Sequence, residues 1–402
     1  MSWTIGNIRE QAFNMQEQLV SWRRELHALA EPAFQEKKTS AYLESKLQEL
    51  GLEVITRAGS DTGLLAFCAT GDSSAPTVAL RADMDALPIE EKTGLPFACQ
   101  EGYMHACGHD AHMAMALGAA AVWKQLPDPP PGNLLLIFQP AEECPPGGAL
   151  TIIGSGHLER FSPRAIFGLH VNPLMDVGSI GLKSGPLMAA ADSFTLKVIG
   201  QGGHGAAPHH CVDPITTASS IIQAWQQLAS RQVDPLEPIV VSIGSIHGGQ
   251  QFNIIAEEVE LKGTVRTLNE SLRESVPSML ETMANRTAEA FGARCEFSYQ
   301  RGFPVLYNDE EKTALVRDMA GQLLNEQDVI ELPNPFMGGE DMAYFLQRIP
   351  GCYFLLGTRP EGVKNPYPWH SPHFDLNEKA LPYGTALLTA CAARALTAVS
   401  EG

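Results

Sequence analysis

Residues 134–143 read Leu-Leu-Leu-Ile-Phe-Gln-Pro-Ala-Glu-Glu, an apolar run that ends at a pair of carboxylates. An uninterrupted apolar run of this length is typical of a strand that is buried on both faces of a sheet. Residues 166–171 form a second such run, and segments with helical patterns alternate with strand-like runs along the chain. This alternation predicts an α/β domain in which a mostly parallel, twisted sheet is flanked by helices.

Helical and strand-like patterns continue on both sides of these two runs. Near the N-terminus, Leu19, Trp22, Leu26 and Leu29 recur at helical spacing. Helices are expected at 4–29, 38–50, 110–126, 309–325, 341–348 and 376–398, and further strands at 52–57, 64–70, 77–82 and 353–357.

The pattern changes after Pro186. Strand, helix, strand, strand, helix and strand are expected in this order between residues 193 and 301. The order βαββαβ is the signature of a ferredoxin-like α+β fold. We therefore expect a first domain built from residues 1–186 and 302–402, with a second domain, 187–301, inserted into it.

Composition excludes several classes of partner. The 402 residues include 28 Lys and Arg against 46 Asp and Glu, a formal charge of −18. This charge argues against nucleic acid and membrane surfaces as partners, because both attract basic proteins. The N-terminus lacks a basic region followed by an apolar core, so no secretory signal is expected. Eight cysteines without a paired spacing indicate reduced thiols in a cytoplasmic protein.

A glycine-rich stretch, Gly200-Gln-Gly-Gly-His-Gly205, matches the G-x-G-x-x-G pattern of dinucleotide-binding proteins. That fingerprint requires a helix to begin inside the motif, so that the helix N-terminus faces the pyrophosphate. Here Pro208 follows at once, and the next expected helix begins near Pro214. We therefore interpret the glycines as allowing the backbone to bring His204 close to another group.

Four short segments concentrate side chains of the kinds that bind metal ions. They are MHACGHDAH (104–112), QPAEE (139–143), GLHV (168–171) and WHSP (369–372). The second and third lie at the carboxyl ends of expected strands, the edge of an open α/β sheet where sites form. Thiolate, imidazole and carboxylate ligands together suit a borderline divalent ion.

The adjacent carboxylates Glu142 and Glu143 sharpen this interpretation. Directly after a buried strand, such a pair is unfavourable unless a cation neutralises one member. Metal-assisted hydrolysis uses this division: one Glu binds metal and its neighbour takes a proton from the activated water. Two interpretations stay open for Asp83 and Asp85. They either hydrogen-bond a ligand histidine and fix its tautomer, or form a strand-end turn that Asp85 caps.

In combination these motifs resemble the amidohydrolase subgroup of the metal-dependent aminoacylase/carboxypeptidase superfamily. That subgroup includes hippurate hydrolases, indole-acetyl-amino acid hydrolases and N-acyl-amino-acid amidohydrolases. The matching segments keep the family's order over most of the chain: RADMDALPIEE (81–91), MHACGHDAHMA (104–114), FQPAEE (138–143), GLHV (168–171), GQGGHGAAPH (200–209), GTVRTLNE (263–270), MGGEDMAYF (337–345) and WHSPHFDLNE (369–378).

The resemblance implies an enzyme that hydrolyses the amide bond of an N-acyl amino acid. It implies two divalent metal ions per subunit, drawn from Mn, Zn, Co and Ni, and Glu142 as the general base. The implied metal ligands are Cys107, His109, Glu143, His170 and His370.

It also implies roles for the inserted domain as a lid and as the surface of a homodimer. His204 is expected to stabilise the oxyanion in the partner subunit's site, and Asn253, Arg266 and Gly339 are expected to bind substrate. Asp83 and Asp85 are expected to support the ligands. The loop after the Glu pair departs from many relatives, because Cys144-Pro-Pro-Gly-Gly replaces a glycine-rich run. The acyl and amino-acid specificity therefore stays open.

Three other functions stay open beside this one. A dipeptidase or carboxypeptidase of the same superfamily would share the motifs. A hydrolase with Cys107 as nucleophile and His109 as base would survive metal chelation. A metal-binding protein without catalysis would not need Glu142 beside Glu143.

Overall fold

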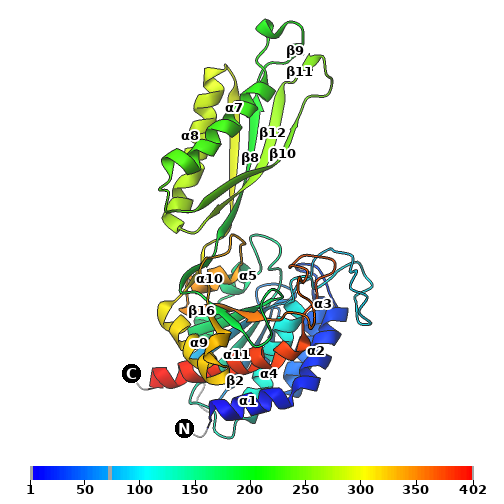
Figure 1. Cartoon of the computed structure of the whole chain (residues 1–402), viewed down its shortest axis with the longest axis vertical. Coiled ribbons are helices and arrows are strands. Elements are labelled where there is room, and N and C mark those ends of the chain that lie inside the picture. Colours follow the sequence, from blue (N-terminus) through cyan, green and yellow to red (C-terminus); the bar gives the residue numbers. More distant parts are fainter. Residues whose placement is uncertain (1–2, 71–74, 401–402) are drawn as a thin grey trace. The chain divides into compact units, whose positions relative to one another are not determined.

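The computed structural model describes residues 3–70 and 75–400, and the chain divides into two compact units (Figure 1). The first unit comprises Met1–Gly185, Tyr307–Asn334 and Asp341–Gly402, and the second comprises Pro186–Leu306 and Pro335–Glu340. The second unit therefore includes a segment, Pro335–Glu340, from well beyond the expected insertion.

An eight-stranded sheet forms the centre of the first unit. Its strands, in spatial order, are β1 (Glu53–Thr56), β2 (Leu64–Ala69), β4 (Asn133–Gln139), β3 (Thr77–Asp83), β5 (Pro163–Asn172), β16 (Gly351–Gly357), β6 (Ile180–Leu182) and β15 (Val329–Glu331). The four central strands run parallel, whereas β1 and β2 form an antiparallel edge and β6 runs antiparallel to β16. The expectation of a mostly parallel sheet is confirmed. Every residue of β3 and β4 is buried, which explains the apolar runs Val78–Leu80 and Leu134–Phe138 within them.

Helices flank this sheet. α4 (His109–Gln125) and α11 (Leu381–Ser400) pack together on one face, with α1 (Ile5–Asn14) and α2 (Gln16–Ala28) against them (Figure 1). α4 is buried from His109 to Trp123, because it lies between the sheet and the other helices, and its many alanines suit this close packing. The remaining helices of this unit are α3 (Lys37–Glu49), α5 (Ala149–Gly154), α6 (His157–Phe161), α9 (Glu310–Leu323) and α10 (Met342–Leu346).

Two helix boundaries differ from expectation. The helix expected at 4–29 is interrupted at Met15, whose backbone lies outside the helical region (φ −90°, ψ 6°). The C-terminal helix begins only at Leu381, after a short 3₁₀ turn at Glu378–Ala380. Among the residues that the structure describes, no helix combines the length and the apolar character needed to cross a bilayer.

The second unit is an antiparallel sheet with two helices. Its strands, in spatial order, are β10 (Ile239–Gly248), β12 (Glu258–Thr267), β8 (Ala190–Ile199) and β13 (Arg294–Phe303). Helices α7 (Pro214–Gln227) and α8 (Glu270–Ala290) pack on each other and on the sheet around Trp225 and Leu280. Along the chain the order is βαββαβ, interrupted by a short ladder between β9 (Gly203–His204) and β11 (Ile254–Ile255).

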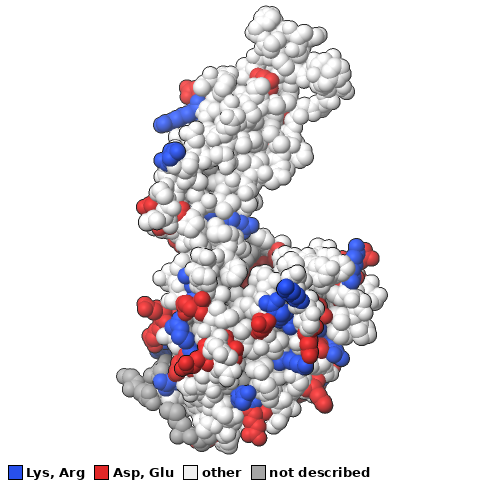
Figure 2. Space-filling view, in the orientation of Figure 1, with Lys and Arg blue, Asp and Glu red and all other residues white. Residues whose placement is uncertain are grey.

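Strands β7 (Gly185–Met188) and β14 (Leu306–Asn308) lie where the chain passes between the units. On the face drawn in Figure 2, basic and acidic side chains intermingle over the first unit. Ion pairs such as Lys379–Glu361 and Arg359–Asp176 belong to that unit.

Candidate metal centre

The carboxyl ends of three neighbouring parallel strands bring distant residues together. β3 ends at Asp83, β4 leads directly into the turn that carries Glu142 and Glu143, and β5 carries His170 near its end. Parallel strands end at the same edge of a sheet, so side chains separated by many residues meet there. This is the edge of the sheet at which the sequence predicts a metal site, and the structure places Asp83, the Glu142–Glu143 turn and His170 there.

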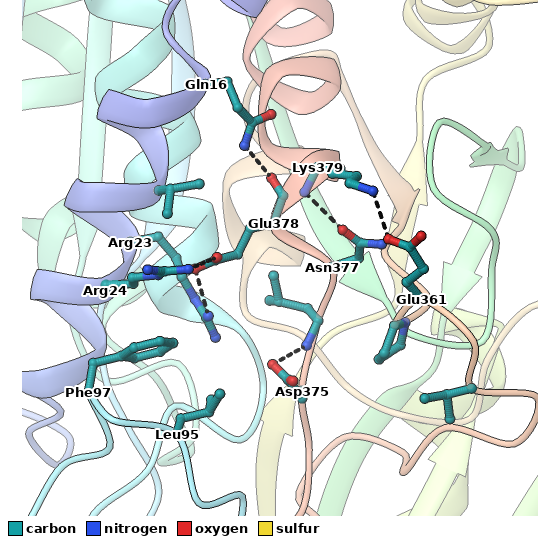
Figure 3. A pocket seen from close by; sticks show the side chains of 14 residues that line it. Gln16, Arg23, Arg24, Leu95, Phe97, Glu361, Asp375, Asn377, Glu378 and Lys379 are labelled. Carbon is teal, nitrogen blue, oxygen red and sulfur yellow. Dashed lines mark hydrogen bonds and ion pairs between the residues drawn. The ribbon is translucent and has the colours of Figure 1, made fainter.

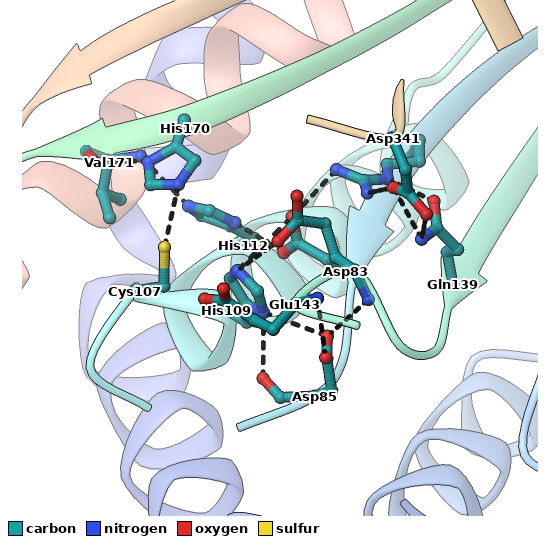
Figure 4. Close-up of polar contacts among 12 residues, drawn as sticks. Asp83, Asp85, Cys107, His109, His112, Gln139, Glu143, His170, Val171 and Asp341 are labelled. Carbon is teal, nitrogen blue, oxygen red and sulfur yellow. Dashed lines mark hydrogen bonds and ion pairs between the residues drawn. The ribbon is translucent and has the colours of Figure 1, made fainter. Parts of the chain in front are cut away.

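The N-terminus of α4 adds Cys107 and His109. Between them, Gly108 has a φ of +92°, and a Cβ atom there would lie 2.3 Å from Cγ2 of Val171. Only glycine fits this turn, which directs both neighbours toward His170 (Figure 4). The Sγ atom of Cys107 lies 3.2 Å from Nε2 of His170.

Hydrogen bonds fix the tautomers of two histidines. Nδ1 of His170 lies 2.8 Å from the carbonyl of Val171, and Nδ1 of His109 lies 2.9 Å from the carbonyl of Asp85. A carbonyl only accepts, so each Nδ1 carries a proton, and Nε2 is the nitrogen of each ring that would bind a metal ion. Nε2 of His109 is buried without a hydrogen-bond partner, as expected of a nitrogen that binds a metal ion.

His370 and Glu143 form a second group of possible ligands beside Cys107. The backbone N–H of His370 donates to the carbonyl of Ala106 at 2.9 Å, which ties this loop beside Cys107. Nε2 of His370 lies 3.2 Å from Oε1 of Glu143, and that oxygen is buried without a hydrogen bond. Ligand atoms of Cys107, His109 and His170 lie within 4.8 Å of one another, as do those of Cys107, Glu143 and His370.

The charge balance of this cluster favours a cation. Burial lowers the pKa of His109, but Asp83, Asp85 and Glu143 outweigh it and raise that pKa to about 10. Burial, Glu143 and Glu142 raise the pKa of the Cys107 thiol well above its usual range. The site thus attracts positive charge. A bound cation would stabilise the thiolate of Cys107, and thiolate, imidazole and carboxylate donors together fit a divalent ion.

Asp85 supports the Glu pair through the backbone. Its two carboxylate oxygens accept the N–H groups of Glu142 and Glu143, each at 3.0 Å. Asp83 hydrogen-bonds Nδ1 of His112 at 2.6 Å and lies 3.8 Å from Nε2 of His109. His112 in turn accepts the N–H of Val171 at Nε2, so both of its ring nitrogens are engaged within the protein.

The remaining expected site residues belong to the second unit, at its two ends. His204 pairs with Ile254 in the β9–β11 ladder, and the carbonyl of the neighbouring Asn253 accepts the N–H of Gly205. At the other end, Arg266 pairs with Ala191, and a Cβ atom on Gly339 would lie 3.5 Å from a guanidinium nitrogen of Arg266. Within this unit, the structure brings together His204 with Asn253, and Arg266 with Gly339.

Residues 79–394 match the family model for peptidase family M20/M25/M40. The chain belongs to this family. It is 41% identical to N-acetyl-L-cysteine deacetylase of Bacillus subtilis over 96% of this chain and 90% of that protein. It is 36% identical to thermostable carboxypeptidase 1 of Saccharolobus solfataricus over 94% of this chain and 96% of that protein.

A solved structure is similarly close. The YXEP protein of Bacillus subtilis, described as a dinuclear metal-binding peptidase of the M20 family, superposes with a TM-score of 0.82. It is 34% identical, and the match covers 96% of this chain and 99% of that one. The resemblance to the amidohydrolase subgroup is confirmed. This M20/M25/M40 chain is a hydrolase of amide bonds with a divalent metal site and a small-molecule substrate.

Several supporting residues of this M20/M25/M40 chain were not expected from its sequence. Arg81 donates to Asp83 and Asp341, each at 2.8 Å, and its Nε donates to Gln139 at 3.0 Å. Arg81 stands inside the motif 81–91, but nothing local indicates that its partner is 260 residues away.

A second buried network lies under α4. Arg23 donates to Asp110, the residue after His109, at 2.6 Å, and His27 lies 2.8 Å from the same carboxylate. Figure 3 shows the hollow above this network, where Arg23 and Arg24 both pair with Glu378 and Lys379 pairs with Glu361. All three cations of this hollow therefore have carboxylate partners.

Proposed function

We propose that this protein is an amidohydrolase that removes the acyl group from N-acyl amino acids, using two divalent ions per subunit. The observation that carries the proposal is the meeting of ligand-type side chains from four distant segments beside Glu142. The proposed ligands are Cys107, His109, Glu143, His170 and His370.

Two overlapping sets of ligand atoms support a pair of ions. One set is Cys107, His109 and His170, and the other is Cys107, Glu143 and His370. Both sets include Cys107, so this residue would help to hold either ion. When bound, divalent ions supply Lewis-acid activation of water and of the scissile carbonyl.

Glu142 would act as the general base and acid. Its Oε2 atom lies 4.0 Å from Nε2 of His109, so the carboxylate faces the ligand cluster. Asp85 holds the backbone of Glu142, which limits the movement of this side chain. Glu142 would take a proton from the attacking water and return it to the leaving nitrogen as the C–N bond breaks. The products are a carboxylic acid and an amino acid.

The dimensions of the second unit support a homodimer. From Ala191, the partner of Arg266, to Ile199 the strand β8 advances by eight steps, roughly 26 Å at the usual rise per residue. His204 lies beyond that far end, so His204 and Arg266 of one subunit cannot contact one small substrate. If both act in catalysis, His204 serves the site of a partner subunit, and the inserted unit provides the interface and a closing lid.

The edge strand β10 offers a surface for that partner. It lies at the margin of the four-stranded sheet, is ten residues long, and exposes Val240 and Ile246. Exposed edge strands present unpaired backbone groups and are natural sites of pairing with a second chain. The eight cysteines are free thiols, which supports the proposed cytoplasmic location.

The test is a substrate panel assayed with metal-depleted protein after each of Mn²⁺, Zn²⁺, Co²⁺ and Ni²⁺ is added back. The panel holds N-acetyl, N-benzoyl and indole-acetyl amino acids together with dipeptides. Metal-dependent release of amino acids from the acyl substrates supports the proposal. Cleavage of dipeptides alone favours the carboxypeptidase alternative. Full activity in EDTA would favour Cys107 as a nucleophile, for which His170, rather than His109, is the adjacent imidazole.

A further inference from the structure

Glu36 is a fully buried carboxylate with three hydrogen-bond donors around it. Its Oε1 atom accepts the N–H groups of Phe34 and Ala141, both at 2.9 Å, and its Oε2 atom accepts the hydroxyl of Thr62 at 2.7 Å. Phe34 is a local neighbour, at the turn before α3. Ala141 is 105 residues away and directly precedes the Glu pair.

Ala141 needs such support. Its φ is +54°, in the left-handed region that residues other than glycine rarely adopt. Its carbonyl accepts the N–H of Gly148 at 3.0 Å, while its N–H is directed at Glu36. The left-handed turn reverses the chain after β4, and in this way it directs the next two residues to the ligand cluster.

Three consecutive backbone N–H groups are held by two buried carboxylates. Glu36 takes that of Ala141, and Asp85 takes those of Glu142 and Glu143. Asp85 lies next to the site and bonds His109 as well, through its carbonyl. Glu36 touches none of the proposed ligands in the contacts above, so its effect on them runs through the backbone of the turn.

We propose that Glu36 is a positioning residue for Glu142 and Glu143: by fixing the left-handed Ala141, it sets the direction of the base and of a metal ligand together. This inference rests on the proposed function for the role of Glu142, but its effect on metal binding through Glu143 does not depend on the substrate.

Glu31 provides a matched control. It belongs to the same turn, is buried, and accepts the N–H groups of Lys38 and Thr39 and the hydroxyl of Thr39 at the start of α3. It therefore supports the start of α3, whereas the side chain of Glu36, the residue before that helix, makes no capping hydrogen bond to it. The contacts of Glu31 do not include Ala141. Loss of Glu31 reports the cost of a weakened helix start alone.

The experiment compares kcat, KM and metal affinity of Glu36→Ala, Glu36→Gln and Glu31→Ala, with Zn²⁺ or Mn²⁺ affinity measured by competition with a chromophoric chelator. Glu36→Ala should lower kcat and metal affinity by roughly 10–100-fold with little change in KM, as supporting residues of metal sites do. Glu31→Ala should keep both values near wild type. Glu36→Gln should keep kcat and metal affinity close to the wild-type values, because its amide oxygen still accepts the N–H of Ala141 while its NH₂ faces Thr62.

Equal behaviour of Glu36→Ala and Glu31→Ala would overturn the inference, and so would a Glu36→Gln protein as impaired as Glu36→Ala. If Glu36→Ala does not fold, Glu36→Asp replaces it: the shorter side chain keeps the charge near Phe34 but does not reach Ala141. Wild-type kcat and metal affinity in Glu36→Asp would then overturn it. If the wild-type protein hydrolyses no acyl amino acid, the proposed function fails, while the order of metal affinities still decides the role of Glu36.

Discussion

Sγ of Cys107 lies 3.2 Å from Nε2 of His170, although 63 residues separate them. The left-handed Gly108 and the end of β5 produce this contact, and the carbonyl of Val171 keeps the proton of His170 on the other ring nitrogen. Nε2 of His170 thus accepts the S–H of Cys107, and both atoms would bind a metal ion once that proton is released.

The first prediction concerns this pair. Cys107→Ser should bind Zn²⁺ or Mn²⁺ about 10–100-fold more weakly, because a hydroxyl is a poorer ligand than a thiolate. Excess metal should restore part of the activity. Activity that stays absent at saturating metal, with metal bound as in the wild type, would instead indicate a nucleophilic cysteine.

The second prediction concerns the buried arginine beneath the site. Arg81→Met leaves the buried carboxylates of Asp83 and Asp341 without their cation, and should lower the free energy of unfolding by about 3–5 kcal/mol. Arg24→Met is the control, because Arg24 is half-exposed in its pair with Glu378 and its loss should cost below about 1 kcal/mol. Urea unfolding of both metal-free variants measures the difference. Equal losses of unfolding free energy would show that Arg81 stabilises the protein no more than the half-exposed Arg24 does.

The sequence predicts the site better than its supports. The proposed ligands Cys107, His109, Glu143, His170 and His370 stand in short motifs that the resemblance to the amidohydrolase subgroup indicates. The supports depend on contacts that no local pattern contains. Arg81 reaches Asp341 across 260 residues and Glu36 reaches Ala141 across 105.

The same limit applies to the fold. The alternation of buried strands and helices predicts the mostly parallel sheet, since β3 and β4 each contain an apolar run and are buried on both faces. The assignment of Pro335–Glu340 to the second unit follows from its backbone contacts with Met188 and Ala189, which no local pattern contains. Neither a proline nor a glycine marks Met15, where the N-terminal helix is interrupted, so the sequence gives no signal for that break.

The third prediction is a pH dependence of stability. Burial lowers the pKa of His27, but its hydrogen bonds to Asp110 and Glu91 outweigh this and raise it above 6.5. A pKa raised by folding stabilises the protein fully below the unfolded value of about 6.5, and this stabilisation is lost as the pH rises through the folded pKa. His27→Gln should therefore lose more unfolding free energy in mildly acidic than in alkaline buffer. If His27→Gln loses as much unfolding free energy in alkaline as in mildly acidic buffer, or more, then His27 is not charged in the folded protein.

The fourth prediction tests whether His204 of one subunit acts in the metal site of its partner. His204→Ala and Glu142→Gln proteins should each be inactive, and co-expression should restore activity. In a mixed dimer, the His204→Ala subunit keeps Glu142 and receives His204 from its partner. Random mixing of a symmetric dimer then restores about a quarter of the sites. No recovery in co-purified mixed dimers would place His204 in its own subunit's site or outside catalysis.

The most direct test of the account is the kcat of Glu142→Gln on the best N-acyl amino acid, with metal content measured in the same sample. We expect kcat to fall by about 10²–10⁴-fold, because the amide cannot take the proton from water. Metal content should stay at the wild-type level, because Glu143 and the other proposed ligands are unchanged. Near-wild-type turnover at full metal content would contradict the role of Glu142 and, with it, the proposed mechanism.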